Sequence, residues 1–286
     1  MCRLFGFRSV IPSQVHRSLV AADNALGVQS DQHPDGWGVA YYVDGSPHLT
    51  RSPSTALGDH LFQRVSGVVS SETVLAHVRK ATVGELSVLN CHPFQYGRWT
   101  FAHNGEVKEF DRHRERVLNE VAPRLRRFIL GETDSEALFY LFLTNLARHG
   151  PLGGRIGLEE VVESLRRTVE QARALCDGPG EEGRALLTFI VTDGQVMAAV
   201  RSGKELFFST YKTRCADREA CPSLSPECEA PSRSGFVNHL LISSEPLLGE
   251  NVWVEMRDDE VVGVDARMRL MRSADAKRRL AVAAAE

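Results

Sequence analysis

The order of strand-like and helix-like segments restricts the fold of this chain more than any other feature. Strand-like runs come first, two long helical patterns follow, and strand-like runs then return, with no internal repeat. This order predicts an α+β domain with two sheets packed face to face and helices outside. The predicted strands cover residues 3–9, 37–43, 72–79, 98–104, 185–192, 195–201, 205–210, 239–243 and 252–264, the last with a break.

Three segments are predicted to be helical. A first helix is expected over residues 14–25. A second begins after Thr133 and is apolar nearly all round, so it should be buried between layers. Thr133 and Glu136 have the spacing of a capping box at its start. The third helix, over 158–175, carries apolar residues on one face and should pack on that side only.

Length and charge exclude several classes of protein. A chain of 286 residues is long enough for a sizeable core. Its 34 basic and 37 acidic side chains give a net charge of −3, which provides no basic surface for nucleic acid. The first residues lack a secretory signal, and no apolar run reaches the roughly 18 residues of a membrane helix. A cytoplasmic protein without nucleic-acid or membrane partners is therefore expected.

The six cysteines do not have the arrangement of a disulfide framework, and a reducing compartment fits thiols that stay free. Cys215, Cys221 and Cys228 lie in a stretch, 215–235, that is predicted to be a long surface loop. They lack the Cys-x₂-Cys spacing of structural zinc, so a metal site there is the less favoured alternative. Neither a metal nor a cofactor is predicted. Cys91 and His92 are not expected to form a catalytic pair, because neighbours on a strand point to opposite faces.

Cys2 directly follows the initiator methionine. If Met1 is removed, one residue carries both a thiol and an α-amine of pKa roughly 8, which is able to accept the thiol proton. The alternative is an unreactive cysteine that happens to occupy this position. The rest of the sequence decides between the two.

Four polar or glycine-containing clusters lie where predicted strands end or the central helix begins, at residues 35–38, 77–82, 103–106 and 133–136. Together with Met1-Cys2-Arg3, they resemble the glutaminase domain of class II glutamine amidotransferases, in the N-terminal nucleophile hydrolase superfamily. The resemblance covers residues 2–265 as a single domain and leaves 266–286 as a C-terminal tail. It implies a four-layer αββα sandwich with Cys2 at the open end of the two sheets.

The resemblance also implies the catalytic residues. Cys2 would be the nucleophile and, through its α-amine, the base. The side-chain amide of Asn104 and the backbone N–H of Gly105 would stabilise the tetrahedral oxyanion. Without the resemblance, Asn-Gly is simply a favoured pair for a type I′ turn. His77 and His103 are expected to pack or to form supporting hydrogen bonds.

A second group of residues would hold the amino-acid end of the substrate. Strand alternation places Arg79 on the face opposite that of Val74, Ala76 and Val78, where a guanidinium grips a carboxylate through two hydrogen bonds. The resemblance assigns Thr82 to the same carboxylate, Asp134 to the substrate α-ammonium, and Gly36 and Trp37 to a backbone segment that approaches the substrate. Structural alternatives are a helix-start aspartate favoured by the helix dipole, and an aromatic ring that only packs.

The expected reaction is attack of the Cys2 thiolate on the glutamine side-chain amide, giving a γ-glutamyl thioester and ammonia, after which water releases glutamate. About 20 residues follow the glutaminase region, too few for a second catalytic domain. Either a separate synthase subunit accepts the ammonia or water is the only acceptor. Two alternatives stay open: a hydrolase of small γ-glutamyl conjugates, as in ergothioneine synthesis, and a catalytically silent partner subunit. The presence of Cys2, Asn104 and Asp134 argues against the silent subunit.

Overall fold

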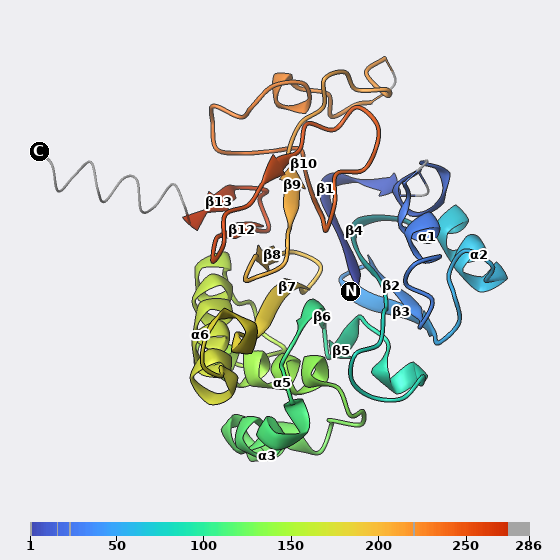
Figure 1. Ribbon diagram of the computed structural model, residues 1–286. Helices are drawn as coiled ribbons and strands as arrows, with labels where there is room; N and C mark the ends of the chain where they lie inside the picture. Colours follow the sequence, from blue (N-terminus) through green and yellow to red (C-terminus); the bar gives the residue numbers. More distant parts are fainter. Residues whose placement is uncertain (1, 16, 23, 220, 274–286) are drawn as a thin grey trace, which may run out of the picture.

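A computed structural model describes residues 2–15, 17–22, 24–219 and 221–273. Two antiparallel sheets lie face to face in the centre of the molecule, with helices on both outer sides (Figure 1). The predicted α+β sandwich of four layers is thus confirmed. The first sheet has the strand order β11-β9-β10-β1-β4-β2-β3, and the second has the order β13-β12-β8-β7-β6-β5.

The strands of the first sheet are β1 (Arg3–Gln14), β2 (Trp37–Val43), β3 (Ser46–Ser52), β4 (Ser70–Val78), β9 (Phe207–Ser209), β10 (His239–Ser243) and β11 (Val254–Glu255). Those of the second are β5 (Phe94–Tyr96), β6 (Trp99–Glu106), β7 (Leu186–Thr192), β8 (Met197–Val200), β12 (Val261–Val264) and β13 (Leu270–Arg272). The α-helices are α1 (Leu26–Gln29), α2 (His60–Val68), α3 (Phe110–Glu120), α4 (Pro123–Arg126), α5 (Asp134–Leu146) and α6 (Leu158–Cys176).

Strand alternation distributes side chains among the layers. On β1, Leu4 packs between the two sheets, whereas Phe5 and Phe7 belong to the apolar cluster beneath α1 and α2. Gly6 faces the opposite sheet, where a Cβ would come within 3.3 Å of Ile190 and Met197. The two sheets therefore approach closely along β1, the strand that begins one residue after Cys2.

Both long helices of the central region are confirmed. In α5, all but one of the thirteen residues are buried, as expected for a helix inside a layer. Thr133 caps it by accepting a hydrogen bond from the Glu136 N–H at 3.2 Å. The reciprocal half of the predicted capping box is absent, because the Glu136 carboxylate accepts from Leu130 and Gly131 instead, at 3.1 and 2.6 Å.

The predicted helix over 14–25 is wrong. β1 continues to Gln14, where it pairs with Ser70 after a bulge, and only a π-helical turn, Arg17–Ala21, and the short α1 follow. The sequence patterns also missed β3, β5, α2 and α3. In α3, only Phe110 and Val117 are fully buried, so its apolar pattern is too sparse to stand out.

The second sheet extends past residue 265, the expected end of the domain. β13 pairs with β12, placing Val262 opposite Arg272 and Val264 opposite Leu270. Residues 274–286, most of the predicted tail, lie outside the described residues. The predicted loop at 215–235 contains only a short 3₁₀ turn, Pro226–Cys228, among its described residues. No helix within the described ranges has the length and apolarity needed to span a membrane.

Candidate active site

Cys2 lies next to the end of β4. In the antiparallel pairing of β1 and β4, Arg3 is opposite Val78, so the next pair along the ladder brings Cys2 opposite Arg79. The Cys2 thiol is bracketed by the backbone of Lys80: Sγ lies 3.5 Å from the Lys80 carbonyl oxygen and accepts from its N–H at 3.4 Å. Cys2 as a whole is only 9% exposed. This register is what brings the predicted nucleophile to the predicted carboxylate-binding arginine.

The segment at residues 35 and 36 is joined to residues 79–81 by main-chain contacts. Arg79 N–H donates to the Gly36 carbonyl at 2.7 Å, and Asp35 N–H donates to the Arg79 carbonyl at 3.1 Å. The Asp35 carboxylate accepts from Ala81 N–H at 2.8 Å. Gly36 has φ +129, and a Cβ there would lie 2.7 Å from Cys91 Sγ. Glycine is therefore required where this backbone passes the site.

The guanidinium of Arg79 is buried and organises the loop that follows it. Its Nη1 and Nη2 donate to three successive carbonyls, those of Glu85 at 3.1 Å, Val83 at 2.8 Å and Gly84 at 3.3 Å. These hydrogen bonds use three of the five N–H donors of a guanidinium. Arg79 therefore has a structural task in addition to the predicted one.

Asn104 and Gly105 lie near the end of β6, and the side chain of Asn104 faces the first sheet. Asn104 shares a strand face with Ala102, which packs between the sheets. Its Nδ2 donates to Ser244 Oγ at 3.3 Å, and that hydroxyl also accepts from the N–H of Leu4 at 2.9 Å. Ser244 thus connects the predicted oxyanion donor to the strand that begins beside Cys2. Gly105 leaves no room for a side chain, because a Cβ would collide with the Leu186 carbonyl.

Asp134 begins α5 and is buried beside the end of β6. Its Oδ2 accepts from the Val107 N–H at 2.7 Å, and its Oδ1 accepts from the N–H and hydroxyl of Ser135 at 2.7 and 3.0 Å. His103 is hydrogen-bonded to Ser135 Oγ and to the Leu186 carbonyl, both at 2.8 Å. These contacts fix the carboxylate in place beside the strand that carries Asn104.

The side chain of Trp37 points away from this cluster. The Trp37 indole is fully buried on the helix side of its sheet, where it packs on Phe62 and donates to Asp59 Oδ2 at 2.9 Å. Since Trp37 pairs with Val78, its side chain lies on the face opposite to that of Arg79. Only its backbone is close to the site. Thr82 lies on the exposed loop after Arg79.

The groups around Cys2 shift the pKa of its thiol in opposite directions. Burial raises the pKa of the thiol, while the Lys80 backbone and the Arg79 guanidinium lower the pKa and the Asp134 carboxylate raises it. The two charged side chains act on the sulfur in opposite directions. The net result is a thiol pKa above its ordinary value, with burial as the main cause.

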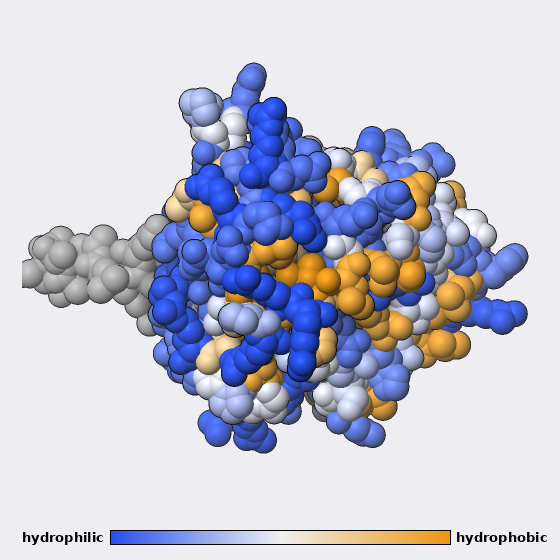
Figure 2. Space-filling view, turned by 90° about the horizontal axis from the view of Figure 1, so that it is seen from below, coloured by the Kyte–Doolittle hydropathy of each residue, from blue (hydrophilic) through white to orange (hydrophobic). Residues whose placement is uncertain are grey.

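Two further features were not identified from the sequence. Ser244 follows an apolar strand in the run Ser243-Ser244-Glu245, the same signal that marked the other clusters. His77 and His92 are buried with ring centroids 4.2 Å apart, and within the described residues their ring nitrogens have no hydrogen-bond partner. On the loop that follows Arg79, the apolar side chains of Leu86 and Leu89 are exposed. Apolar side chains also gather across the middle of one face of the molecule (Figure 2).

Comparison with known families identifies this arrangement. A family model described as glutamine amidotransferases class-II matches residues 1–282. The chain belongs to the class II glutamine amidotransferases. A probable glutamine amidotransferase of Saccharomyces cerevisiae, DUG3, is 30% identical over an alignment of 226 residues that covers 70% of this chain and 63% of that protein. The gamma-glutamyl-hercynylcysteine sulfoxide hydrolase of Mycobacterium tuberculosis is 34% identical over 119 residues, 37% of this chain and 50% of that protein.

Solved structures give the same fold for this class II amidotransferase chain. A glutamine aminotransferase class-II domain protein from Silicibacter pomeroyi matches with a TM-score of 0.62 at 22% identity, covering 95% of this chain and 98% of that one. Glutamine phosphoribosylpyrophosphate amidotransferase from B. subtilis matches with a TM-score of 0.60 at 15% identity, covering 95% of this chain and 49% of that one. The fold is that of the N-terminal nucleophile hydrolases.

Proposed function

We propose that this protein hydrolyses the side-chain amide of glutamine to glutamate and ammonia, with Cys2 as the nucleophile. The observation that carries the proposal is the convergence of Cys2, Arg79 and Asn104, from three separate strands, at one end of the two sheets. A nucleophile, a carboxylate grip and an oxyanion donor are the groups that amide hydrolysis needs. Family membership agrees with this chemistry.

The reaction begins after removal of Met1. The new α-amine of Cys2 takes the thiol proton, and the thiolate attacks the carboxamide carbon to give a tetrahedral oxyanion. Asn104 Nδ2 has two N–H groups, one for Ser244 and one for this oxyanion, and the Gly105 N–H is the second donor. Collapse transfers a proton to the leaving nitrogen and releases ammonia, leaving a γ-glutamyl thioester. Water then attacks the thioester and releases glutamate and the thiol.

Substrate binding is assigned to residues around the thiol. The free N–H groups of Arg79, assisted by the Thr82 hydroxyl, bind the α-carboxylate, and Asp134 binds the α-ammonium. The backbone at Gly36 and Trp37 lines the other side of the bound substrate. Support for these roles comes from the burial of Arg79 and Asp134 and from their action on the Cys2 thiol. The ammonia passes to a synthase partner or is released.

A second candidate is the hydrolysis of a small γ-glutamyl conjugate. The stretch similar to the M. tuberculosis sulfoxide hydrolase supports it, because only the leaving group differs between the two reactions. The exposed apolar side chains of Leu86 and Leu89 beside Arg79 offer a surface for a leaving group larger than ammonia. Both candidates use the same thioester.

The test combines covalent labelling with a substrate panel. The purified full chain is incubated with 6-diazo-5-oxo-L-norleucine, and the labelled peptide is identified by mass spectrometry, with Cys176→Ala as a matched control for a buried, distant thiol. We expect a single adduct on Cys2 with a free α-amine, and loss of the adduct in Cys2→Ala. Rapid glutamine turnover supports the first candidate, and turnover of γ-glutamyl amides alone supports the second. Retention of Met1, or no adduct on an unblocked Cys2, would contradict both and favour a silent subunit.

A further inference from the structure

A cavity lies at the far end of β1 from Cys2. Its volume is about 630 Å³, within the range of roughly 300–1,000 Å³ that is typical of small-molecule sites. It is enclosed by the distal half of β1, the π-helical turn, β10 and the loop that contains Cys215. Ser9 is seven residues along β1 from Cys2, which at strand rise is roughly 23 Å. The cavity is therefore separate from the proposed catalytic site.

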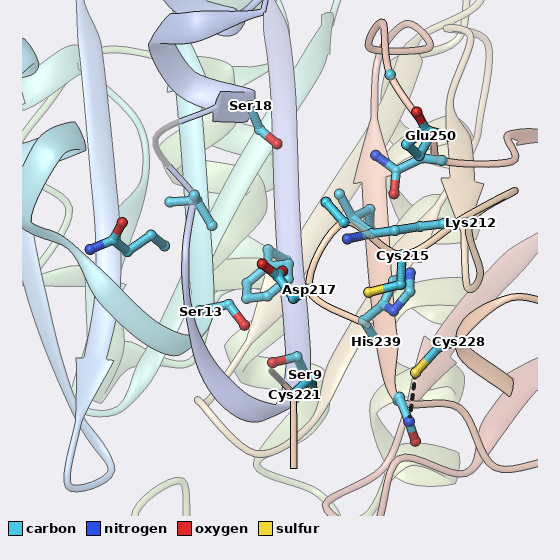
Figure 3. A pocket seen from close by; sticks show the side chains of 18 of the residues that line it. Ser9, Ser13, Ser18, Lys212, Cys215, Asp217, Cys221, Cys228, His239 and Glu250 are labelled. Carbon is cyan, nitrogen blue, oxygen red and sulfur yellow. Dashed lines mark hydrogen bonds between the residues drawn. The ribbon is translucent and has the colours of Figure 1, made fainter. Parts of the chain in front are cut away.

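The floor of this cavity is apolar and its walls are polar. Phe7, Val15, Leu241 and Leu247 are buried and line it. Above them, hydroxyl groups from β1 and the π-helical turn face the loop across the opening, among them those of Ser13 and Ser18 (Figure 3). A ligand would thus have an apolar body and polar ends.

Two buried polar atoms lie on the β10 side of the cavity. Within the described residues, His239 Nε2 and Asn251 Oδ1 are buried and have no hydrogen-bond partner. His239 is opposite Ser9 in the strand ladder, and both side chains line the cavity. Burial, and secondarily the charge of Lys212, lowers the pKa of His239 to about 4, so its ring is neutral at pH 7. Buried polar atoms of this kind are normally satisfied by a partner, here one inside the cavity.

The charged side chains that line the cavity indicate which class of ligand would fit it. They are the ammonium of Lys212 and the carboxylates of Asp217 and Glu250. Glu250 accepts from the Thr213 hydroxyl at 2.7 Å. In the part of the loop that the structure describes, Arg218 forms an ion pair with Glu229 at 3.4 Å, whereas Lys212 and Asp217 form none. Among the lining side chains that the structure describes, one cation stands against two carboxylates. A polyanion such as a nucleotide would be repelled there, whereas a ligand with both an ammonium and a carboxylate would be matched at each end.

We propose that this cavity binds a short zwitterionic peptide with an apolar side chain. Its carboxylate meets Lys212 and His239, its ammonium meets Asp217, and its side chain lies on Phe7 and Leu241. The site is independent of hydrolysis at Cys2, so its existence does not depend on the function proposed above.

The test uses the thiols of the cavity as reporters. Cys215, Cys221 and Cys228 all line it, and Cys221 is partly exposed. The full chain is treated with N-ethylmaleimide with and without L-leucylglycine, and alkylation of each cysteine is followed by mass spectrometry. Titration calorimetry in parallel gives Kd. The matched probes are N-acetyl-leucylglycine and leucylglycinamide, each of which lacks one charge.

We expect leucylglycine to slow alkylation of Cys221 while the rate at Cys176 stays unchanged, and each capped probe to bind about tenfold more weakly. Lys212→Met should abolish the preference for the free carboxylate, and Asp217→Asn the preference for the free ammonium, while Glu159→Gln on the exposed side of α6 should change neither. Equal binding of capped and uncapped probes, or no protection of Cys221 at millimolar peptide, would overturn the proposal.

Discussion

The hydroxyl of Ser244 lies 3.3 Å from Nδ2 of Asn104. The same oxygen accepts the Leu4 N–H at 2.9 Å, and the Ser244 N–H donates to the Leu4 carbonyl at 3.1 Å. One serine therefore fixes both the rotation of an amide on the second sheet and the start of β1 on the first. A donor held in this way needs no reorientation when an oxyanion forms, which is the condition for electrostatic stabilisation of a transition state.

Ser244→Ala should lower kcat by about tenfold with little change in KM, because the Asn104 amide loses its anchor while substrate contacts remain. Asn104→Ala should lower kcat further, by about 10² to 10³. Steady-state kinetics of both variants, beside Ser243→Ala as a buried neighbour on β10, measure the difference. Ser244→Ala kinetics indistinguishable from those of Ser243→Ala would remove Ser244 from the site.

Arg79→Lys should raise KM at least as much as it lowers kcat. Lysine cannot reproduce the forked contact with a carboxylate, and that contact exists before the transition state. The variant should also loosen the loop at residues 83–85, whose carbonyls the guanidinium holds. Steady-state kinetics on glutamine test this. The control is Arg201→Lys, at the residue that directly follows β8. An unchanged KM would count against the carboxylate-binding role.

Trp37→Phe should reduce stability without changing KM. The indole ring packs in an apolar cluster and its N–H donates to Asp59 at 2.9 Å, so the substitution removes a partly buried hydrogen bond worth roughly 1 kcal/mol and adds a void. Denaturant unfolding and glutamine kinetics on the same variant separate the two effects. If KM rises while the free energy of unfolding is unchanged, the ring itself takes part in substrate binding.

Acid should destabilise the protein through the buried histidine pair. Burial, and secondarily the nearby Arg79 charge, lowers the pKa of His77 from 6.5 to about 3, and burial lowers that of His92 as well. Between these pH values the unfolded chain binds more protons than the folded one, so the stabilisation present above about pH 6.5 is lost progressively as pH falls toward 3. His77 contributes up to about 1.4 kcal/mol per pH unit in that window, and His92 acts in the same direction.

Urea unfolding at several values between pH 7.5 and 4 measures this slope. His77→Leu should flatten it, whereas replacement of the exposed His60 by Leu should leave it as in the wild type. A slope that His77→Leu does not alter would mean that other groups cause the acid sensitivity.

Much of the fold follows from local patterns. The apolar α5 and the one-faced α6 are readable in the sequence because helical periodicity records which faces are covered. Polar clusters at the ends of apolar strands likewise mark Asn104 and Arg79. The helix expected over residues 14–25 fails because pairing with β4 keeps β1 extended to Gln14, and tertiary pairing overrides a local pattern.

The sequence by itself determined which residues share a strand face, so that Arg79 and Val78 point to opposite faces of β4. The position of Cys2 directly after Met1 made it a candidate nucleophile. Only the tertiary structure decided what covers each face. It turned the Trp37 ring into the core, brought Ser244 to an asparagine 140 positions earlier, and enclosed a cavity between β1 and the loop around Cys215. Alternation along a strand has a period of two whatever lies above it, so the identity of the covering layer depends on contacts between distant segments.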